Sequence, residues 1–113
     1  MTQEFSRAND DVARARLAQS AVAYAFGVPP DELEAPTRRS REAAFARQAA
    51  MYLAHIAFEL SLSRVAQAFG RDRSTAAHAC HRIEDRRDDR GFDQSMDALE
   101  ACLRSAPQPG EPE

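Results

Sequence analysis

The segment 71–82 is rich in side chains that can read base pairs in the major groove of DNA. The guanidinium groups of Arg71 and Arg73 could each donate two hydrogen bonds to the O6 and N7 atoms of guanine. The Asp72 carboxylate could accept a hydrogen bond from cytosine N4. The other residues of suitable type offer a methyl group to thymine or a polar group to bases and phosphates: Ser74, Thr75, His78, Ala79 and Arg82.

Each of these residues also has a purely structural interpretation. Asp72 could cap the N-terminus of a helix, because a side-chain carboxylate can accept from the unpaired amides of a first turn. Ser74 and Thr75 are ordinary residues of a first helical turn. Arg82 could pair with acidic residues on its own helix. The residue types alone therefore leave both interpretations open.

Five amphipathic segments and a scarcity of glycine predict an all-α fold with a small, alanine-rich core. Helices are expected over residues 11–26, 42–58, 62–69, 73–88 and 93–104. The tight turn Gly70–Asp72 joins the third and fourth helices, which predicts a helix-turn-helix. In that motif the second helix enters the major groove, and its N-terminal residues meet base edges.

The periodicity of apolar residues assigns a buried face to each helix. In the first helix, with Asp10 as the expected N-cap, the expected core residues are Leu17, Ala21, Tyr24 and Val28. In the fourth helix they are Ala76, Cys80 and Ile83. A different face of this helix carries Ser74, Thr75, His78 and Arg82. The expected helix boundaries are a cap at Ser61 and stops at Gly70 and Gly91.

The charge distribution is uneven along the chain, whose net charge is −3. Residues 1–35 carry three arginines against six acids (−3), residues 36–82 eight against three (+5), and residues 83–113 four against nine (−5). A phosphate-binding surface in the middle of the chain would give this pattern. A solvated, charged helix face would give it too.

Other classes of function find little support. His78, Cys80 and His81 do not share one helix face and have no second ligand cluster, so we expect no metal and no cofactor. No catalytic pattern is present, and we do not expect an enzyme. Cys80 and Cys102 read as buried thiols in a reducing cytosol. No signal peptide or membrane span is expected.

The domain organisation is expected to be simple. Residues 1–10 read as a flexible N-terminus and residues 11–104 as one folded domain. Residues 105–113, with three prolines and two glutamates, read as a disordered acidic tail.

The combined pattern resembles the C-terminal DNA-binding domain of the bacterial replication initiator DnaA. The resemblance rests on the stretches 46–53, 61–62 and 68–84, and it extends upstream through 38–41 and 26–28 to cover roughly residues 11–104. The family signature Arg-Asp-His-Thr-Thr is similar to Arg71-Asp72-Arg73-Ser74-Thr75. The resemblance implies a helical domain whose helix-turn-helix reads a nine-base-pair DnaA box.

The resemblance also implies roles for residues outside the signature. Arg39 corresponds to an arginine that a basic loop sends into the minor groove, with Arg38 and Arg41 beside it. His78 corresponds to a base-contacting histidine. Gln48 and Arg82 correspond to residues that contact phosphates.

Several departures from the family pattern affect the expected site. Arg73 replaces a histidine, Ser74 replaces a threonine, and the turn before Arg71 has one glycine, Gly70, where the family usually has two. Phe45 stands where the family often has arginine. The preferred DNA sequence is therefore expected to differ from the standard box. The chain has no lysine, so it cannot contain the phosphate-binding loop of the initiator's ATPase module.

The sequence thus predicts a sequence-specific binder of double-stranded DNA in the bacterial cytoplasm, associated with the nucleoid and acting as a monomer. It would regulate transcription or modulate replication initiation. The alternative is a protein-interaction module on the same fold, which docks the initiator or another regulator without binding DNA.

Overall fold

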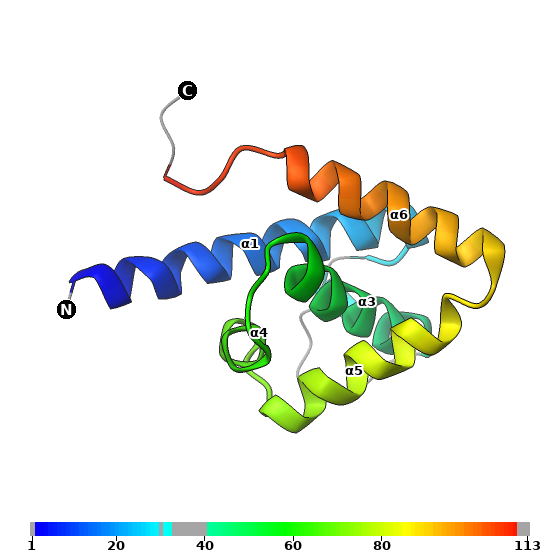
Figure 1. Cartoon of the computed structure of the whole chain (residues 1–113), viewed down its shortest axis with the longest axis horizontal. Helices are drawn as coiled ribbons and strands as arrows, with labels where there is room; N and C mark the ends of the chain where they lie inside the picture. Colours follow the sequence, from blue (N-terminus) through cyan, green and yellow to red (C-terminus); the bar gives the residue numbers. More distant parts are fainter. Residues whose placement is uncertain (1, 30, 33–40, 111–113) are drawn as a thin grey trace.

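A computed structural model of the chain describes residues 2–29, 31–32 and 41–110. In this part of the chain five helices and no strand are present: α1 (Thr2–Phe26), α3 (Arg41–Ala57), α4 (Leu62–Phe69), α5 (Arg73–Arg86) and α6 (Arg90–Ser105). The predicted all-α class and the helix-turn-helix are confirmed, with α4 and α5 as its two helices (Figure 1).

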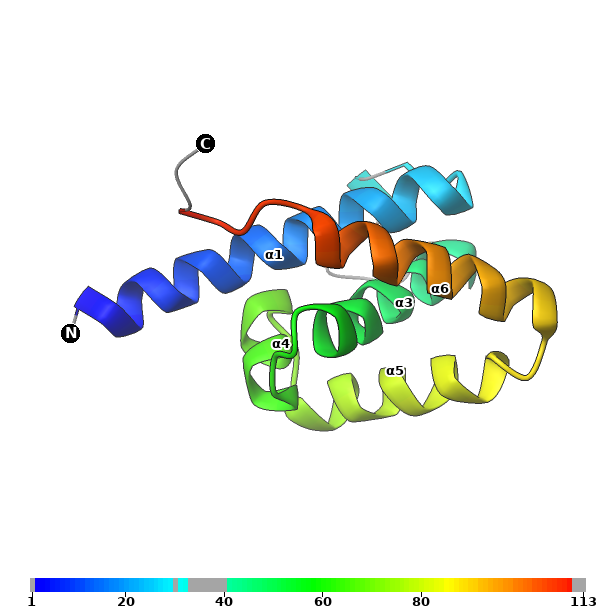
Figure 2. The ribbon, with the colours of Figure 1, turned by 45° about the horizontal axis from the view of Figure 1, so that its top comes forward.

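Helix α3 lies at the centre of the fold and contacts each of the other four described helices. Figure 2 shows α1 and α6 on one side of α3 and α5 on the other. The main core lies where α3 meets α1, α6 and the later part of α5, and its fully buried side chains include Val22, Leu53, Ile83 and Met96. Alanine dominates the rest of α3's buried surface, and its small side chain lets the helices approach closely.

A second, smaller core supports the helix-turn-helix. Its members come from the end of α3, the loop that follows it, and the two helices of the motif: Met51, Ala54, Leu60, Val65, Ala66, Ala76 and Ala79. Phe58, Leu62 and Phe69 are partly buried and pack against this core.

The boundaries of α4 match the sequence prediction. The Ser61 side chain accepts a hydrogen bond from the Arg64 amide at 3.2 Å, which is the expected N-cap. Gly70 ends the helix in the left-handed conformation (φ 66°), and the Arg71 amide donates to the Ala66 carbonyl at 2.8 Å. This pair of contacts fixes the direction in which the chain leaves α4 and enters α5.

Three boundary predictions are wrong. Helix α1 begins at Thr2, so Asp10 lies within the helix and does not cap it, and residues expected to form a flexible N-terminus are helical. No glycine or proline interrupts residues 2–10, which is why the helix extends so far. Helix α5 ends at Arg86, and Gly91 lies in the first turn of α6, where Asp89 caps the helix by accepting from the Phe92 amide at 3.0 Å.

The predicted buried face of α1 is also largely wrong. Tyr24 is 91 % exposed and Leu17 is 39 % exposed. A neighbouring stripe of smaller residues, including Ala18 and Val22, is fully buried instead. Only Val28 of the expected set belongs to the buried core, with Ala21 partly buried beside it.

No helix among the described residues is long and apolar enough to cross a membrane. Of the C-terminal segment, residues 106–110 are described, and the Arg14 Nε group donates to the Gln108 side-chain oxygen at 3.2 Å, which holds this segment against α1. The proposed limits of the folded domain stay predictions.

Candidate nucleic-acid interface

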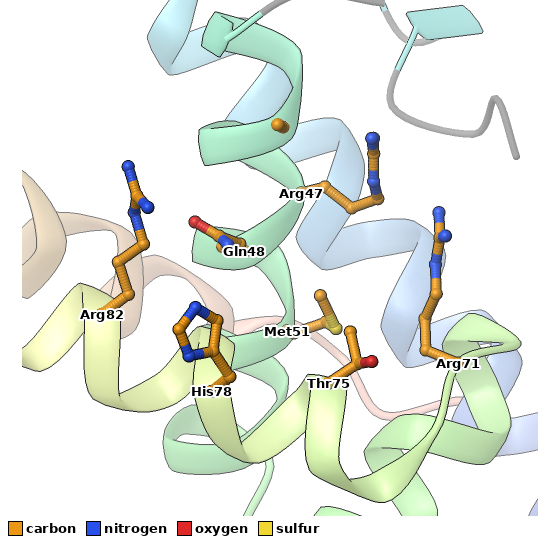
Figure 3. Close-up of a pocket in the computed structure, with 8 residues that line it drawn as sticks. Arg47, Gln48, Met51, Arg71, Thr75, His78 and Arg82 are labelled. Atoms are coloured by element: carbon orange, nitrogen blue, oxygen red, sulfur yellow. The ribbon is translucent and has the colours of Figure 1, made fainter. Parts of the chain in front are cut away.

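A concavity of about 290 Å³ opens between α3 and the first half of α5 (Figure 3). Polar and basic side chains from both helices and from the turn line it: Arg47, Gln48, Arg71, Thr75, His78 and Arg82, with Ala44 and Met51 between them. Figure 3 shows Arg82 and Arg71 towards the two ends of the concavity and Gln48, His78 and Thr75 between them. Five of the predicted site residues therefore share one surface.

Helical spacing explains why these side chains meet. Thr75, His78 and Arg82 follow one another at intervals of three and four residues, which places them on one face of α5. The apolar residues Ala76 and Ile83, both 0 % exposed, hold the opposite face against the core. The predicted separation of the two faces is thus confirmed.

Arg47 is a member of this surface that the sequence reasoning missed. It lines the concavity from α3 but is only 5 % exposed. It lies within an alanine-rich stretch whose apolar periodicity was assigned to the core, so Arg47 was not considered as a site residue. The available signal was its position next to Gln48, which the resemblance had already marked as a phosphate-contact residue.

Asp72, Arg73 and Ser74 are exposed at the start of α5, outside the concavity. Asp72 occupies the N-cap position, but its side chain makes no capping hydrogen bond. The predicted capping hydrogen bond from a first-turn amide is therefore not seen, and the Asp72 side chain is exposed to solvent.

The predicted contact between Ala79 and DNA is wrong. Its side chain is 0 % exposed and packs in the small core under the helix-turn-helix, so its methyl group cannot reach thymine. Arg41, the first residue of α3, is exposed and does not line the concavity. Arg38 and Arg39 lie outside the described residues, and their predicted role at the minor groove stays a prediction.

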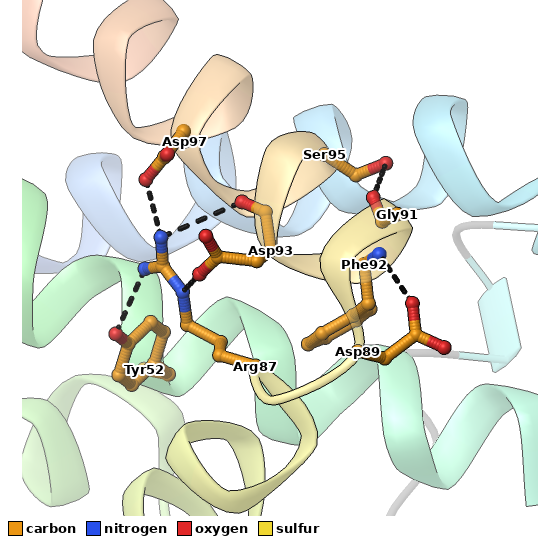
Figure 4. Close-up of polar contacts among 8 residues, drawn as sticks. All are labelled: Tyr52, Arg87, Asp89, Gly91, Phe92, Asp93, Ser95 and Asp97. Carbon is orange, nitrogen blue, oxygen red and sulfur yellow. Dashed lines mark hydrogen bonds and ion pairs between the residues drawn. The ribbon is translucent and has the colours of Figure 1, made fainter.

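Arg82 and Arg86, in the second half of α5, and Arg87, its C-cap, have different environments. The guanidinium carbon of Arg86 lies 4.9 Å above the centre of the Phe45 ring. Arg87 donates to Tyr52, Asp93 and Asp97, which joins α5 to α3 and α6 (Figure 4). Burial lowers the pKa of Arg87, but the hydrogen bonds to Asp93, Tyr52 and Asp97 outweigh it and raise that pKa overall.

Arg82 differs from both, because no ion pair or hydrogen bond to it occurs within the described part of the chain. The alternative prediction, pairing with acids on its own helix, is therefore not seen. Its charge is available to a ligand in the concavity. Nor do any three His, Cys, Asp or Glu side chains of the described residues cluster as they would around a metal ion.

The sequence model of the family described as "Bacterial dnaA protein helix-turn-helix" matches residues 15–83. This chain belongs to that family. The match spans more than half of the chain and includes α3, α4 and most of α5, which are the helices that build the concavity. Family members bind double-stranded DNA through this domain.

Individual relatives agree with this assignment. The chromosomal replication initiator protein DnaA of Symbiobacterium thermophilum is 41 % identical over 69 residues, which are 59 % of this chain and 15 % of the relative. DnaA of Deinococcus deserti is 36 % identical over 83 residues, which are 74 % of this chain and 17 % of the relative. The chain thus corresponds to about a sixth of each initiator's length.

A solved structure shows the same fold. The crystal structure of a DNA replication initiation factor superposes with a TM-score of 0.75 and 24 % sequence identity, covering 88 % of this chain and 30 % of that one. The family model that matches residues 15–83 is that of the helix-turn-helix.

Proposed function

We propose that this protein binds double-stranded DNA sequence-specifically, at a site related to the DnaA box, and that it regulates transcription or modulates replication initiation. The observation that carries the proposal is the concavity between α3 and α5, in which Arg71, Thr75, His78 and Arg82 lie beside Gln48 and Arg47. Residues of these types supply both base contacts and phosphate contacts in helix-turn-helix proteins.

Residues at the start of α5 and residues that border the concavity would have different roles in DNA binding. Asp72, Arg73 and Ser74 project from the exposed N-terminus of α5, the part of a recognition helix that enters the major groove. Arg82 and Gln48 border the concavity, where they would hold the phosphate backbone. The first group would set the sequence that is read, and the second would fix the register of the protein on the duplex.

Arg73 and Ser74 are expected to shift the preferred sequence. An arginine at the first position of α5 favours guanine through its O6 and N7 atoms. Serine lacks the methyl group with which threonine contacts the thymine methyl. We therefore expect recognition of a DnaA-box-like sequence with a new guanine preference at the position that Arg73 faces.

Fluorescence anisotropy with two labelled duplexes tests this function. One duplex carries a standard DnaA box and the other a scrambled sequence, and each is titrated at two salt concentrations. Binding that prefers the box and weakens with salt supports the proposal, with a shallow slope if about four to six phosphates are contacted. Equal binding of both duplexes would point to a diverged site, which selection from random duplexes would identify.

Substitutions at the start of α5 separate base reading from general affinity. Asp72→Ala and Thr75→Ala should reduce the preference for the selected sequence more than they reduce binding to the scrambled duplex. Ser20→Ala, which removes a hydroxyl from the distant surface of α1, serves as the control. Full discrimination by both α5 variants would contradict the assignment of this helix to the major groove.

An open apolar groove favours a second candidate function, the protein-interaction module that docks the replication initiator. The groove lies between α1 and α6 and is lined by Leu17, Tyr24, Leu99 and Cys102, among smaller residues. It is remote from the α3–α5 concavity, so DNA binding does not explain it. Binding of the purified initiator that is lost in Tyr24→Ser, together with no binding to any duplex, would favour this function.

A further inference from the structure

Asp11 is a buried acid on α1 that joins this helix to the helix-turn-helix. It is 5 % exposed, and of the described residues only Arg47 is a similarly buried charged side chain. The two Asp11 carboxylate oxygens accept from Arg64 of α4, Oδ2 from Nε at 2.9 Å and Oδ1 from Nη2 at 2.8 Å. Arg14, one turn along α1, donates to Oδ1 at 3.2 Å.

This ion pair has the geometry of a strong contact. A guanidinium that donates two parallel hydrogen bonds to one carboxylate fixes both the distance and the orientation of its partner. The hydrogen bond to Asp11 raises the pKa of Arg64, against the opposing effect of burial and with the added effect of the Asp11 charge. The Arg64 guanidinium therefore stays charged at neutral pH.

The ion pair matters because, among the described residues, it is the only salt bridge that joins α4 to another helix. The helix has eight residues, of which Val65 and Ala66 are buried and Leu62 and Phe69 are partly buried against the core. The same residue, Arg64, also donates its amide to the Ser61 cap, so the start of α4 is held at one point by two contacts. Asp11 thus supplies a directional polar contact between α1 and the start of α4, in addition to the apolar packing of α4.

Movement of α4 would be transmitted to the DNA-contacting residues. The left-handed Gly70 and the hydrogen bond from the Arg71 amide to Ala66 connect the end of α4 rigidly to the turn. Arg71 lines the concavity directly, and α5 begins two residues later. A shift of α4 would therefore displace Arg71 relative to Gln48 on α3.

We propose that Asp11 is a positioning residue for DNA binding: through its bidentate ion pair with Arg64 it fixes α4 on α1 and so places Arg71 and the start of α5 against α3. The inference rests on the proposed sequence-specific function, but it concerns a residue that would not touch DNA. It assigns a role in recognition to α1, which lies outside the helix-turn-helix.

The loss of a negative charge and the loss of positioning would change the DNA affinity of Asp11→Asn in opposite directions. Removing an acid makes the protein less negative, which by electrostatics alone should leave DNA binding unchanged or strengthen it. Loss of positioning should weaken specific binding. Asp10→Asn is the matched control, because it removes the same charge from the adjacent residue, which has no ion pair among the described residues.

The first measurement is the affinity of each variant for the preferred duplex and for the scrambled one. We expect Asp11→Asn to bind the preferred duplex about tenfold more weakly, and Asp10→Asn to stay within about twofold of the unchanged protein. Arg64→Lys, which keeps the positive charge but loses the double hydrogen bond, should resemble Asp11→Asn. If Arg64→Lys binds normally while Arg64→Gln does not, Arg64 contacts phosphate directly and the inference is wrong.

Hydrogen exchange of the DNA-free protein gives a second readout. In Asp11→Asn, amides of residues 62–72 should exchange faster while those in the centre of α3 stay protected, and Asp10→Asn should match the unchanged protein. Unaltered exchange over 62–72 overturns the inference whatever the duplexes show. A protein that binds neither duplex would contradict the proposed function, whereas faster exchange confined to 62–72 would still support the role of Asp11 in holding α4. If Asp11→Asn does not fold, the milder Arg64→Lys carries both measurements.

Discussion

Removal of the Arg82 side chain provides a quantitative test of the interface. Arg82 lines the concavity from α5, and no described residue forms an ion pair with it. Arg82→Ala therefore breaks no ion pair or hydrogen bond among the described residues, and the free energy of unfolding should change by no more than about 0.5 kcal/mol. Any effect on DNA binding then reports on the interface itself.

The size of the effect follows from counterion release. Each phosphate neutralised on duplex DNA contributes about −0.9 to the slope of log K against log salt concentration. If Arg82 neutralises one phosphate, the slope for Arg82→Ala is shallower by about 0.9. Between 200 mM and 50 mM salt, the affinity ratio of the unchanged protein to the variant should therefore rise by about 3.5-fold.

The assay is anisotropy on the preferred and the scrambled duplex at four salt concentrations. Because a phosphate contact carries no sequence information, the preference between the two duplexes should stay constant. Arg16→Ala is the control, since Arg16 is an exposed arginine on α1 away from the concavity. An unchanged slope for Arg82→Ala, or an equal change for Arg16→Ala, would refute the assignment of Arg82 to the backbone.

Three further predictions concern stability. Glu59 has a left-handed backbone (φ 57°), so Glu59→Gly should raise the free energy of unfolding by about 0.5–1 kcal/mol in urea titrations, and a decrease would contradict the reasoning. Leu53→Ala, at a fully buried site, should cost about 2–5 kcal/mol, whereas Leu17→Ala, at a 39 % exposed site, should cost less than about 1 kcal/mol; equal costs would contradict the burial of α3. Burial, with a smaller effect of the Glu84 charge, raises the pKa of the Cys80 thiol to about 11. The folded state thus retains a proton that the unfolded state loses, so stability should fall as pH rises from about 9 to 11, and Cys80→Ala should lessen this fall.

The sequence predicted the elements around the DNA-contacting segment well because their signals are local. Ser61 and Gly70 mark the two ends of α4 through contacts within one turn of the helix. The same holds for the buried stripe of α5, where Ala76 and Ile83 follow a clear helical period. These signals fixed both the helix-turn-helix and the exposed face that carries His78.

Long-range packing decided the features that the sequence did not predict. Helix α1 carries two adjacent apolar stripes. Which of the two is buried depends on the helices that pack against α1, and the sequence of α1 alone does not specify these. The larger side chains, Leu17 and Tyr24, suggested the wrong stripe, because the alanine-rich surface of α3 accepts small residues such as Ala18. The sequence likewise indicated only that Asp11 begins a helix. Its partner Arg64 is distant in the sequence, so the ion pair between them could not be predicted.

Alanine explains the one error within the candidate site. Ala79 was assigned to the groove because a methyl group can contact thymine, but a methyl group fits equally well into a tight helix–helix contact. On α5 the residue lies between the core stripe and the exposed face, and the close approach of α4 takes it into the core. His78 and Arg82, whose polar groups cannot be buried without partners, had no such alternative and stay at the surface. Residues of a recognition helix are therefore assigned from sequence most securely where the side chain is too polar to be covered by the protein itself.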